Sequence, residues 1–174
     1  MRVAIFSNAR TGSTTLYKYL TKSLDYYSLA PPFDRKFFNL DFKSEVWTRE
    51  NVVVKFMFEF LPIVDRIQKS FDKTIFLTRT NDAEGAESLA HAMKTGVWNR
   101  PYVSINFTKE EIDKYISIRK QQREKIQSLG GFQITYEEIF YSDTGVKRLN
   151  DFFGISTDQF AYLLDNRHRL KKLK

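Results

Sequence analysis

The chain has 174 residues, of which 28 are Lys or Arg and 21 are Asp or Glu, so its formal net charge is +7. The length favours one domain with one hydrophobic core, and 42% hydrophobic with 28% charged residues excludes disordered and collagen-like chains. The absence of cysteine excludes disulfides and thiolate-ligated metals, and two histidines, His91 and His168, are too few for a multi-histidine metal site. We therefore expect one domain over residues 1–174 and no metal.

Hydropathy and charge further limit the class of protein and the kind of partner. No apolar run approaches the ~18 residues of a membrane span, and residues 3–6 read as a strand instead of a signal peptide, so we expect a cytoplasmic protein. Residues 163–174 hold five basic residues and one acidic residue, a balance of +4, which leaves +3 for the other 162 residues. Because the chain outside this tail is nearly balanced in charge, we expect a small anion and not a nucleic-acid polymer as the partner. The basic tail either binds that anion or only adds solubility.

Strand and helix patterns alternate along the chain. Short apolar runs predict strands at residues 3–6, 52–58, 74–78 and 132–136. Apolar residues at helical spacing predict helices at about 16–24, 61–68, 82–97 and 108–130, with two short helices after residue 136. Thr108 and Glu111 form a capping box, and Gly130 and Gly131 are suited to end that helix. The alternation predicts an α/β fold of three layers: a mostly parallel sheet of about four to five strands with helices on both faces.

The polar loop after the first strand is the first candidate for a binding site, because ligands of parallel sheets bind at the carboxyl ends of the strands. In the segment Ser7–Thr15, Gly12 permits close approach by an anion and Arg10 adds a cation. Hydroxyl donors come from the next three residues, Ser13, Thr14 and Thr15. The pattern predicts a phosphate cradle; the alternative is a tight turn whose hydroxyls only cap the helix.

The loop does not have the Walker pattern. G-x-x-x-x-G-K-[ST] needs a glycine five residues before Gly12 and a lysine directly after it, but Ser7 and Ser13 stand there. A typical P-loop kinase or GTPase is therefore disfavoured.

The loop and the third strand together resemble the sulfotransferases that use 3′-phosphoadenosine 5′-phosphosulfate (PAPS). The segment Arg10-Thr11-Gly12-Ser13-Thr14 after a strand resembles the 5′-phosphosulfate loop of that family. The strand that runs into Arg79, with Ser88 on the next helix, resembles the family's 3′-phosphate motif.

Three further segments in the right order extend this resemblance. The segments 54–57 and 89–98 look like the second strand and a helix of the bacterial trehalose-type branch, and Tyr136-Glu137-Glu138-Ile139 resembles the family's Tyr-Glu-Asp-Leu segment. The family's glycine-rich basic loop is not recognisable, and the tail around residues 167–172 is a possible substitute. The resemblance implies a P-loop-like sulfotransferase fold.

The resemblance also implies roles for individual residues. Arg10 occupies the position of the family's catalytic lysine or arginine and would stabilise the departing bridging oxygen. The expected PAPS-binding residues are Arg10, Thr11, Gly12, Ser13, Thr14 and Thr15 at the phosphosulfate, Arg79 and Ser88 at the 3′-phosphate, and Tyr136 near the adenosine. The alternative for Arg79 is an ion pair with Asp82 or Glu84, and the alternative for Tyr136 is a place in the core.

A general base is needed for the acceptor hydroxyl. Some members of the family use a histidine after the second strand, but Met57 stands there; Asp34 and Glu59 are the candidate carboxylates. Lys55 lies inside an apolar strand, so it either points to the site or stays solvated. An aromatic cluster in and beside the irregular segment 28–50 forms either a wall for the acceptor or a lid that packs on itself; its members are Tyr26, Tyr27, Phe33, Phe37, Phe38 and Phe42.

The sequence therefore predicts a sulfotransferase that moves a sulfuryl group from PAPS to a hydroxyl of a small-molecule or carbohydrate acceptor, with 3′-phosphoadenosine 5′-phosphate (PAP) as product. The alternatives are a non-catalytic nucleotide-binding module and a divergent nucleotide kinase. We expect no metal, no nucleic-acid polymer and no membrane span. A homodimer is a further possibility, because a short chain with a reduced acceptor site could be completed by a second copy.

Overall fold

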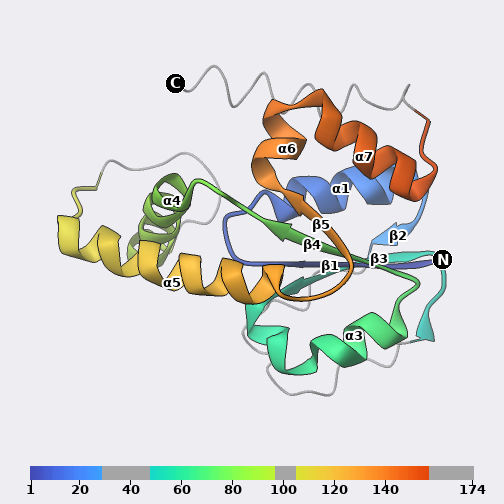
Figure 1. The fold of residues 1–174 in the computed structure, drawn as a ribbon, viewed down its shortest axis with the longest axis horizontal. Helices are drawn as coiled ribbons and strands as arrows, with labels where there is room; N and C mark the ends of the chain where they lie inside the picture. Colours follow the sequence, from blue (N-terminus) through green and yellow to red (C-terminus); the bar gives the residue numbers. More distant parts are fainter. Residues whose placement is uncertain (29–47, 97–104, 157–174) are drawn as a thin grey trace.

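A computed structural model of the chain describes residues 1–28, 48–96 and 105–156. Its strands are β1 (Arg2–Ser7), β2 (Tyr27–Ser28), β3 (Val52–Met57), β4 (Lys73–Thr78) and β5 (Phe132–Thr135). Its helices are α1 (Ser13–Ser23), the 3₁₀ helix η2 (Phe58–Ile63), α3 (Val64–Ser70), α4 (Asp82–Thr95), α5 (Lys109–Gln127), α6 (Tyr136–Tyr141) and α7 (Asp143–Phe153). The strands form one sheet in the order β2-β3-β1-β4-β5, and every neighbouring pair is parallel (Figure 1).

The sheet separates two hydrophobic cores, and alternate residues of its strands supply them. In β1, Val3 and Ile5 belong to the core that includes α1, α6 and α7, whereas Ala4 and Phe6 belong to the core that includes α3 and the end of α5. This alternation follows from the two-residue repeat of a strand. Figure 1 shows the same arrangement, with α1, α6 and α7 on one side of the sheet and α3 and α5 on the other. The expected three-layer α/β fold is confirmed.

Several element boundaries differ from the sequence prediction. The edge strand β2 was not predicted, because two residues are too short to show a period. Helix α5 begins with the predicted capping box but ends at Gln127, with Ser128 as its cap, before the two glycines. Tyr136 starts α6 instead of ending β5, because Thr135 and Glu138 form a second capping box there. Among the described residues, no helix is both long and apolar enough to cross a membrane.

Gly145 fixes the contact between α6 and α7. A Cβ atom at this position would lie 2.2 Å from the carbonyl oxygen of Glu138, which is backbone and cannot swing aside. We expect Gly145→Ala to lower the free energy of unfolding by about 2 kcal/mol, as for other overpacked sites. Urea denaturation measures this, with Gly130→Ala as the control, because nothing lies within 4 Å of a Cβ atom at Gly130. Equal stability of the two variants would show that α7 can shift away from α6.

Candidate active site

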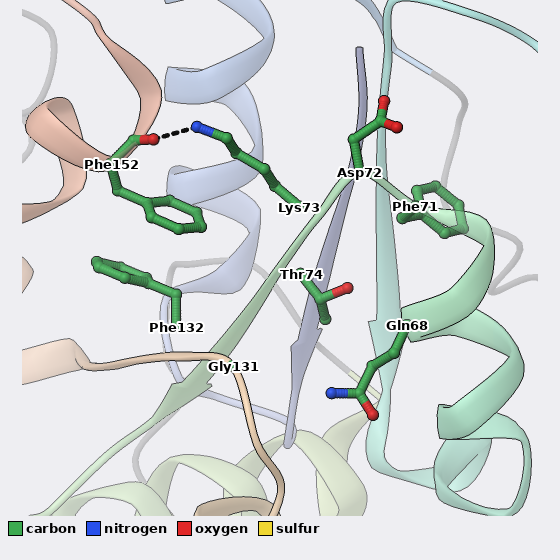
Figure 2. A pocket seen from close by; sticks show the side chains of 8 residues that line it. All are labelled: Gln68, Phe71, Asp72, Lys73, Thr74, Gly131, Phe132 and Phe152. Carbon is green, nitrogen blue, oxygen red and sulfur yellow. Dashed lines mark hydrogen bonds between the residues drawn. The ribbon is translucent and has the colours of Figure 1, made fainter.

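Different residues gather at the two ends of the sheet. At the amino ends of β4 and β5 lies a pocket of about 490 Å³, lined by residues that include Lys73, Thr74 and Phe132 (Figure 2). No residue of the predicted site lines it. The predicted phosphosulfate loop and Arg79 lie instead at the carboxyl ends, where β1 leads into the loop at residues 8–12 and β4 leads into Arg79. This is the end at which parallel sheets bind ligands.

The loop between β1 and α1 has an unusual backbone. Arg10 has a φ of 61° and Gly12 a φ of 75°, both in the left-handed region. A Cβ atom at Gly12 would lie 2.7 Å from the Phe140 ring and 2.8 Å from the Tyr136 ring. Glycine is therefore required by the backbone angle and by the approach of α6, in addition to any approach of an anion.

The hydroxyl groups of the loop point to different partners. Thr11 is buried and donates a hydrogen bond from its hydroxyl to the Asn8 carbonyl at 2.9 Å, so it braces the loop. Gly12 is the N-cap of α1, and no side chain makes a cap hydrogen bond there. The Thr15 N–H donates to the Gly12 carbonyl at 3.0 Å, and Gly12 itself has no side chain with which to cap α1.

Lys55 reaches the loop from inside the sheet. Strand alternation puts its side chain on the α1 face, with Val53, and only 9% of the residue is exposed. Its Nζ donates to Thr14 Oγ1 at 3.1 Å. Burial lowers the pKa of the Lys55 ammonium below its usual value. The question that the sequence left open is thus answered: this lysine points to the start of α1.

Arg79 is buried and contacts several groups of the protein, although its Nε makes no hydrogen bond. Its guanidinium lies 2.8 Å from the Glu84 carboxylate and 3.9 Å from that of Glu137. Nη1 donates to the Arg10 carbonyl at 3.3 Å, and the guanidinium carbon lies 4.3 Å from the centre of the Tyr136 ring. The predicted pairing alternative is therefore seen for Glu84, whereas Asp82 pairs with Arg123 at 2.7 Å.

Ser88 and Arg10 are brought together from opposite halves of the predicted site. Arg10 Nε donates to Ser88 Oγ at 2.7 Å, which ties the loop after β1 to helix α4. The structure thus unites the predicted phosphosulfate and 3′-phosphate segments.

Glu137 holds the turn between β4 and α4. Its carboxylate accepts from the backbone N–H groups of Thr80 and Asn81, each at 3.0 Å. Burial raises the pKa of Glu137, but the hydrogen bonds to its carboxylate, these two among them, together outweigh burial and the net shift is downward. Asn81 in turn accepts from the Glu84 N–H at 3.1 Å and caps α4.

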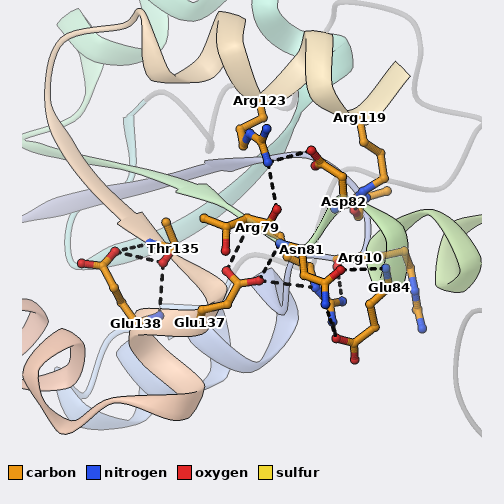
Figure 3. Close-up of polar contacts among 12 residues, drawn as sticks. Arg10, Arg79, Asn81, Asp82, Glu84, Arg119, Arg123, Thr135, Glu137 and Glu138 are labelled. Carbon is orange, nitrogen blue, oxygen red and sulfur yellow. Dashed lines mark hydrogen bonds and ion pairs between the residues drawn. The ribbon is translucent and has the colours of Figure 1, made fainter. Parts of the chain in front are cut away.

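Two arginines of α5 also belong to this cluster, and sequence reasoning missed them. Arg123 Nη1 donates to the Thr80 carbonyl at 3.0 Å, and Arg119 Nη1 donates to the Ala9 carbonyl at 2.6 Å (Figure 3). Burial, and secondarily the charge of Arg79, lowers the pKa of Arg119 to about 10. The helical spacing of Arg119 and Arg123, four residues apart, was the available signal that both lie on one face.

The remaining predicted site residues are Tyr136, Asp34 and Glu59. Tyr136 is buried between Gly12 and Arg79, and burial raises the pKa of its phenol. Asp34, most of the aromatic segment and the basic tail lie outside the described residues. Glu59 belongs to η2, directly beyond the carboxyl end of β3. Within the described ranges, no group of three or more His, Cys, Asp and Glu residues could hold a metal ion.

The burial of Lys55 has a consequence for stability that depends on pH. At a pH below the folded-state pKa, both states are protonated and the full cost of burying the charge is present. As the pH rises towards the usual value of 10.5, the folded state loses its proton first and that cost shrinks. We therefore expect Lys55→Met to be more stable than the wild type at pH 7, with a difference that decreases towards pH 10.5.

Urea denaturation of both proteins across this pH range measures the effect, and the difference at each pH cancels the titration of other groups. Lys18→Met, at an exposed position of α1, controls for the loss of a positive charge. A destabilised Lys55→Met variant, or a difference that does not change with pH, would contradict the prediction.

Comparison with known proteins shows a sulfotransferase-like fold. The structure matches the crystal structure of mouse sulfotransferase SULT7A1 complexed with PAP, with a TM-score of 0.61 and 16% sequence identity. The match covers 95% of this chain and 64% of the mouse chain, so this chain spans about two thirds of the length of its structural relative. A scan against protein-family models and a search of curated proteins found no match.

Proposed function

We propose that the protein is a PAPS-dependent sulfotransferase that acts on a hydroxyl group of a small-molecule or carbohydrate acceptor. The observation that carries the proposal is that Lys55 contacts Thr14 at the start of α1 and Arg10 contacts Ser88 of α4, both at the carboxyl end of a sulfotransferase-like sheet. A helix start with nearby cations is a favourable site for a phosphate or sulfate group. The solved relative was crystallised with PAP, which supports the same nucleotide here.

The phosphosulfate end of PAPS fits the residues present. Gly12 and Arg10 have the left-handed backbone that lets successive N–H groups face an anion, and Ser13 to Thr15 open the helix. Thr14 is exposed next to the Lys55 ammonium, so a hydroxyl and a cation are available together. In this proposal, Thr11 supports the loop through its own hydrogen bond instead of binding through its hydroxyl.

The 3′-phosphate end of PAPS fits only if Arg79 exchanges one of its present partners for the phosphate. Arg79 has the fork geometry that suits a phosphate, and Ser88 offers a hydroxyl near it. Glu84 already occupies one side of the Arg79 guanidinium, but 42% of its side chain is exposed, so it can turn towards water. We infer that a 3′-phosphate replaces the Glu84 carboxylate on Arg79.

The chemistry is an in-line transfer of the sulfuryl group. The acceptor oxygen forms a bond to sulfur while the bond from sulfur to the bridging oxygen breaks, and PAP leaves with the negative charge on that oxygen. Arg10 and Lys55 would stabilise this charge, since fixed cations in a partly buried site act most strongly where charge develops. The hydroxyl proton would pass to a carboxylate, for which Asp34 and Glu59 remain the candidates.

The finer assignments stay part of the proposal. Similarity of the segments 54–57 and 89–98 supports the bacterial trehalose-type branch. The small surplus of charge on the body supports a small anion and not a nucleic-acid polymer as the partner. A homodimer that completes the acceptor site is compatible with the short chain.

One observation favours a second candidate, a nucleotide-binding module without catalysis. Met57 ends β3 where some sulfotransferases have a histidine, and its sulfur accepts from the Ser7 hydroxyl at 3.9 Å. A thioether cannot accept the proton of an acceptor hydroxyl. Such a module would bind PAP and transfer no sulfuryl group.

Nucleotide preference is the direct test of the proposed function. We expect PAP to stabilise the protein against heat more than ATP or AMP does, because only PAP carries the 3′-phosphate that Arg79 and Ser88 would bind. At 100 times its Kd, PAP adds about 2.7 kcal/mol to the free energy of unfolding. Differential scanning fluorimetry measures this. Stabilisation by ATP and not by PAP would replace the proposal with a divergent nucleotide kinase.

Removal of the Glu84 charge tests the exchange on Arg79. We expect Glu84→Gln to tighten PAP binding about fivefold, because about 1 kcal/mol of competing ion-pair energy disappears. AMP, which lacks the 3′-phosphate, should bind both proteins equally. Isothermal titration calorimetry measures both affinities, with Glu87→Gln on the exposed side of α4 as the control. Weaker PAP binding by Glu84→Gln would mean that Glu84 positions Arg79 instead of competing for it.

A further inference from the structure

We propose that Arg119 is a positioning residue of the anion site: it holds the loop after β1 in its binding conformation and places a buried positive charge behind it. The identity of the anion rests on the proposed function, but the role of Arg119 in the loop does not. Arg119 lies on α5, more than one hundred residues after the loop in sequence, and no part of the predicted site includes it.

The reach of Arg119 to the loop depends on a glycine in α4. Its side chain is only 1% exposed, and Nη1 donates to the Ala9 carbonyl at 2.6 Å. The guanidinium passes over Gly85, where a Cβ atom would lie 2.5 Å from Nε and Nη2. Any larger residue at position 85 would therefore displace the guanidinium from the loop.

Two consecutive carbonyl groups of the loop are each held by a buried arginine. Arg119 binds the Ala9 carbonyl, and Arg79 binds the Arg10 carbonyl. In a planar trans peptide the N–H group points opposite to the carbonyl, so each N–H that follows one of these carbonyls points away from the guanidinium group that binds that carbonyl. Arg10 between them has a φ of 61°, which an arginine adopts only when its surroundings impose it. The two hydrogen bonds supply that constraint.

Among the described residues, no carboxylate in direct contact balances the positive charge of Arg119. Among the described residues, no carboxylate lies within 4.0 Å of its guanidinium, and its Nε has no hydrogen-bond partner. Burial of a charge without a direct counter-ion costs several kcal/mol. An apolar side chain would fill the same space without that cost, so the charge has a use that the packing of α4 and α5 does not require. The Asp82 and Glu137 carboxylates attract this charge without direct contact, and an anion at the adjacent loop would add to that attraction.

Three variants separate positioning from packing. Arg119→Met removes the charge and the hydrogen bond, Arg119→Lys keeps the charge without the fork, and Gly85→Ala keeps the arginine but displaces it. The first measurement needs no ligand: ¹⁵N relaxation gives order parameters for the amides of Arg10, Thr11 and Gly12. In the wild type we expect values of about 0.85, and in Arg119→Met and Gly85→Ala values below about 0.6. The amides of β1 should not change.

The second measurement is binding of PAP and of inorganic pyrophosphate by calorimetry, at a temperature where near-UV circular dichroism shows every variant to be folded. We expect Arg119→Met to bind both anions about tenfold to hundredfold more weakly and Arg119→Lys to lie between it and the wild type. Gly130→Ala is the control for Gly85→Ala. If Arg119→Met does not fold, Gly85→Ala and Arg119→Lys carry the test.

The outcomes of these two measurements separate the role of Arg119 from the identity of the anion. Unchanged loop order in Arg119→Met or Gly85→Ala, or unchanged affinity for both anions, would overturn the role of Arg119. A wild type that binds pyrophosphate but not PAP, with pyrophosphate binding lost in Arg119→Met, would support Arg119 and reject PAPS as the substrate. A wild type that binds neither anion would overturn both proposals.

Discussion

The contact between Gly12 and α6 is the constraint on which the rest of the site depends. The rings of Tyr136 and Phe140 lie where any side chain at position 12 would be, so the loop, the start of α1 and helix α6 meet at a single point. From this point Tyr136 supports the Arg79 guanidinium, and the next residue, Glu137, fixes the turn before α4. The glycine at position 12 therefore allows the loop after β1 to pack directly against the start of α6, which follows β5.

Electrostatic balance is the second organising feature. Arginines from the loop, from β4 and from α5 gather at one end of the sheet, and carboxylates at the start of α4 and α6 lie among them (Figure 3). Most of these charges are tied to the backbone: Glu137 and Arg123 hold the turn at Thr80, and Arg119 and Arg79 hold the loop. The fold thus uses charged side chains to fix the backbone at the strand ends.

The sequence was informative where chemistry is local. A strand, a run of small hydroxyl residues and an arginine predicted the loop, and the Thr108 capping box was read correctly because both partners lie within four residues. Long-range contacts were not predictable in the same way. Arg119 reaches the Ala9 carbonyl across 110 residues of sequence, and the buried position of Lys55 depends on the register that pairs it with Ile5. The requirement for glycine at position 12 comes from rings more than 120 residues away, which no local pattern reveals.

The hydrogen bond from Arg10 to Ser88 has a consequence for selectivity. Together with the pairing of Arg79 and Glu84, it means that the side chains of Arg10 and Arg79 have partners before any ligand arrives. Binding is then a substitution of partners and not a filling of empty positions. A simple ion such as chloride can replace only one of these contacts, so it gains little. A ligand with two anionic groups at a fixed separation can replace both contacts at once. The protein's own contacts would therefore favour such a ligand over simple salts.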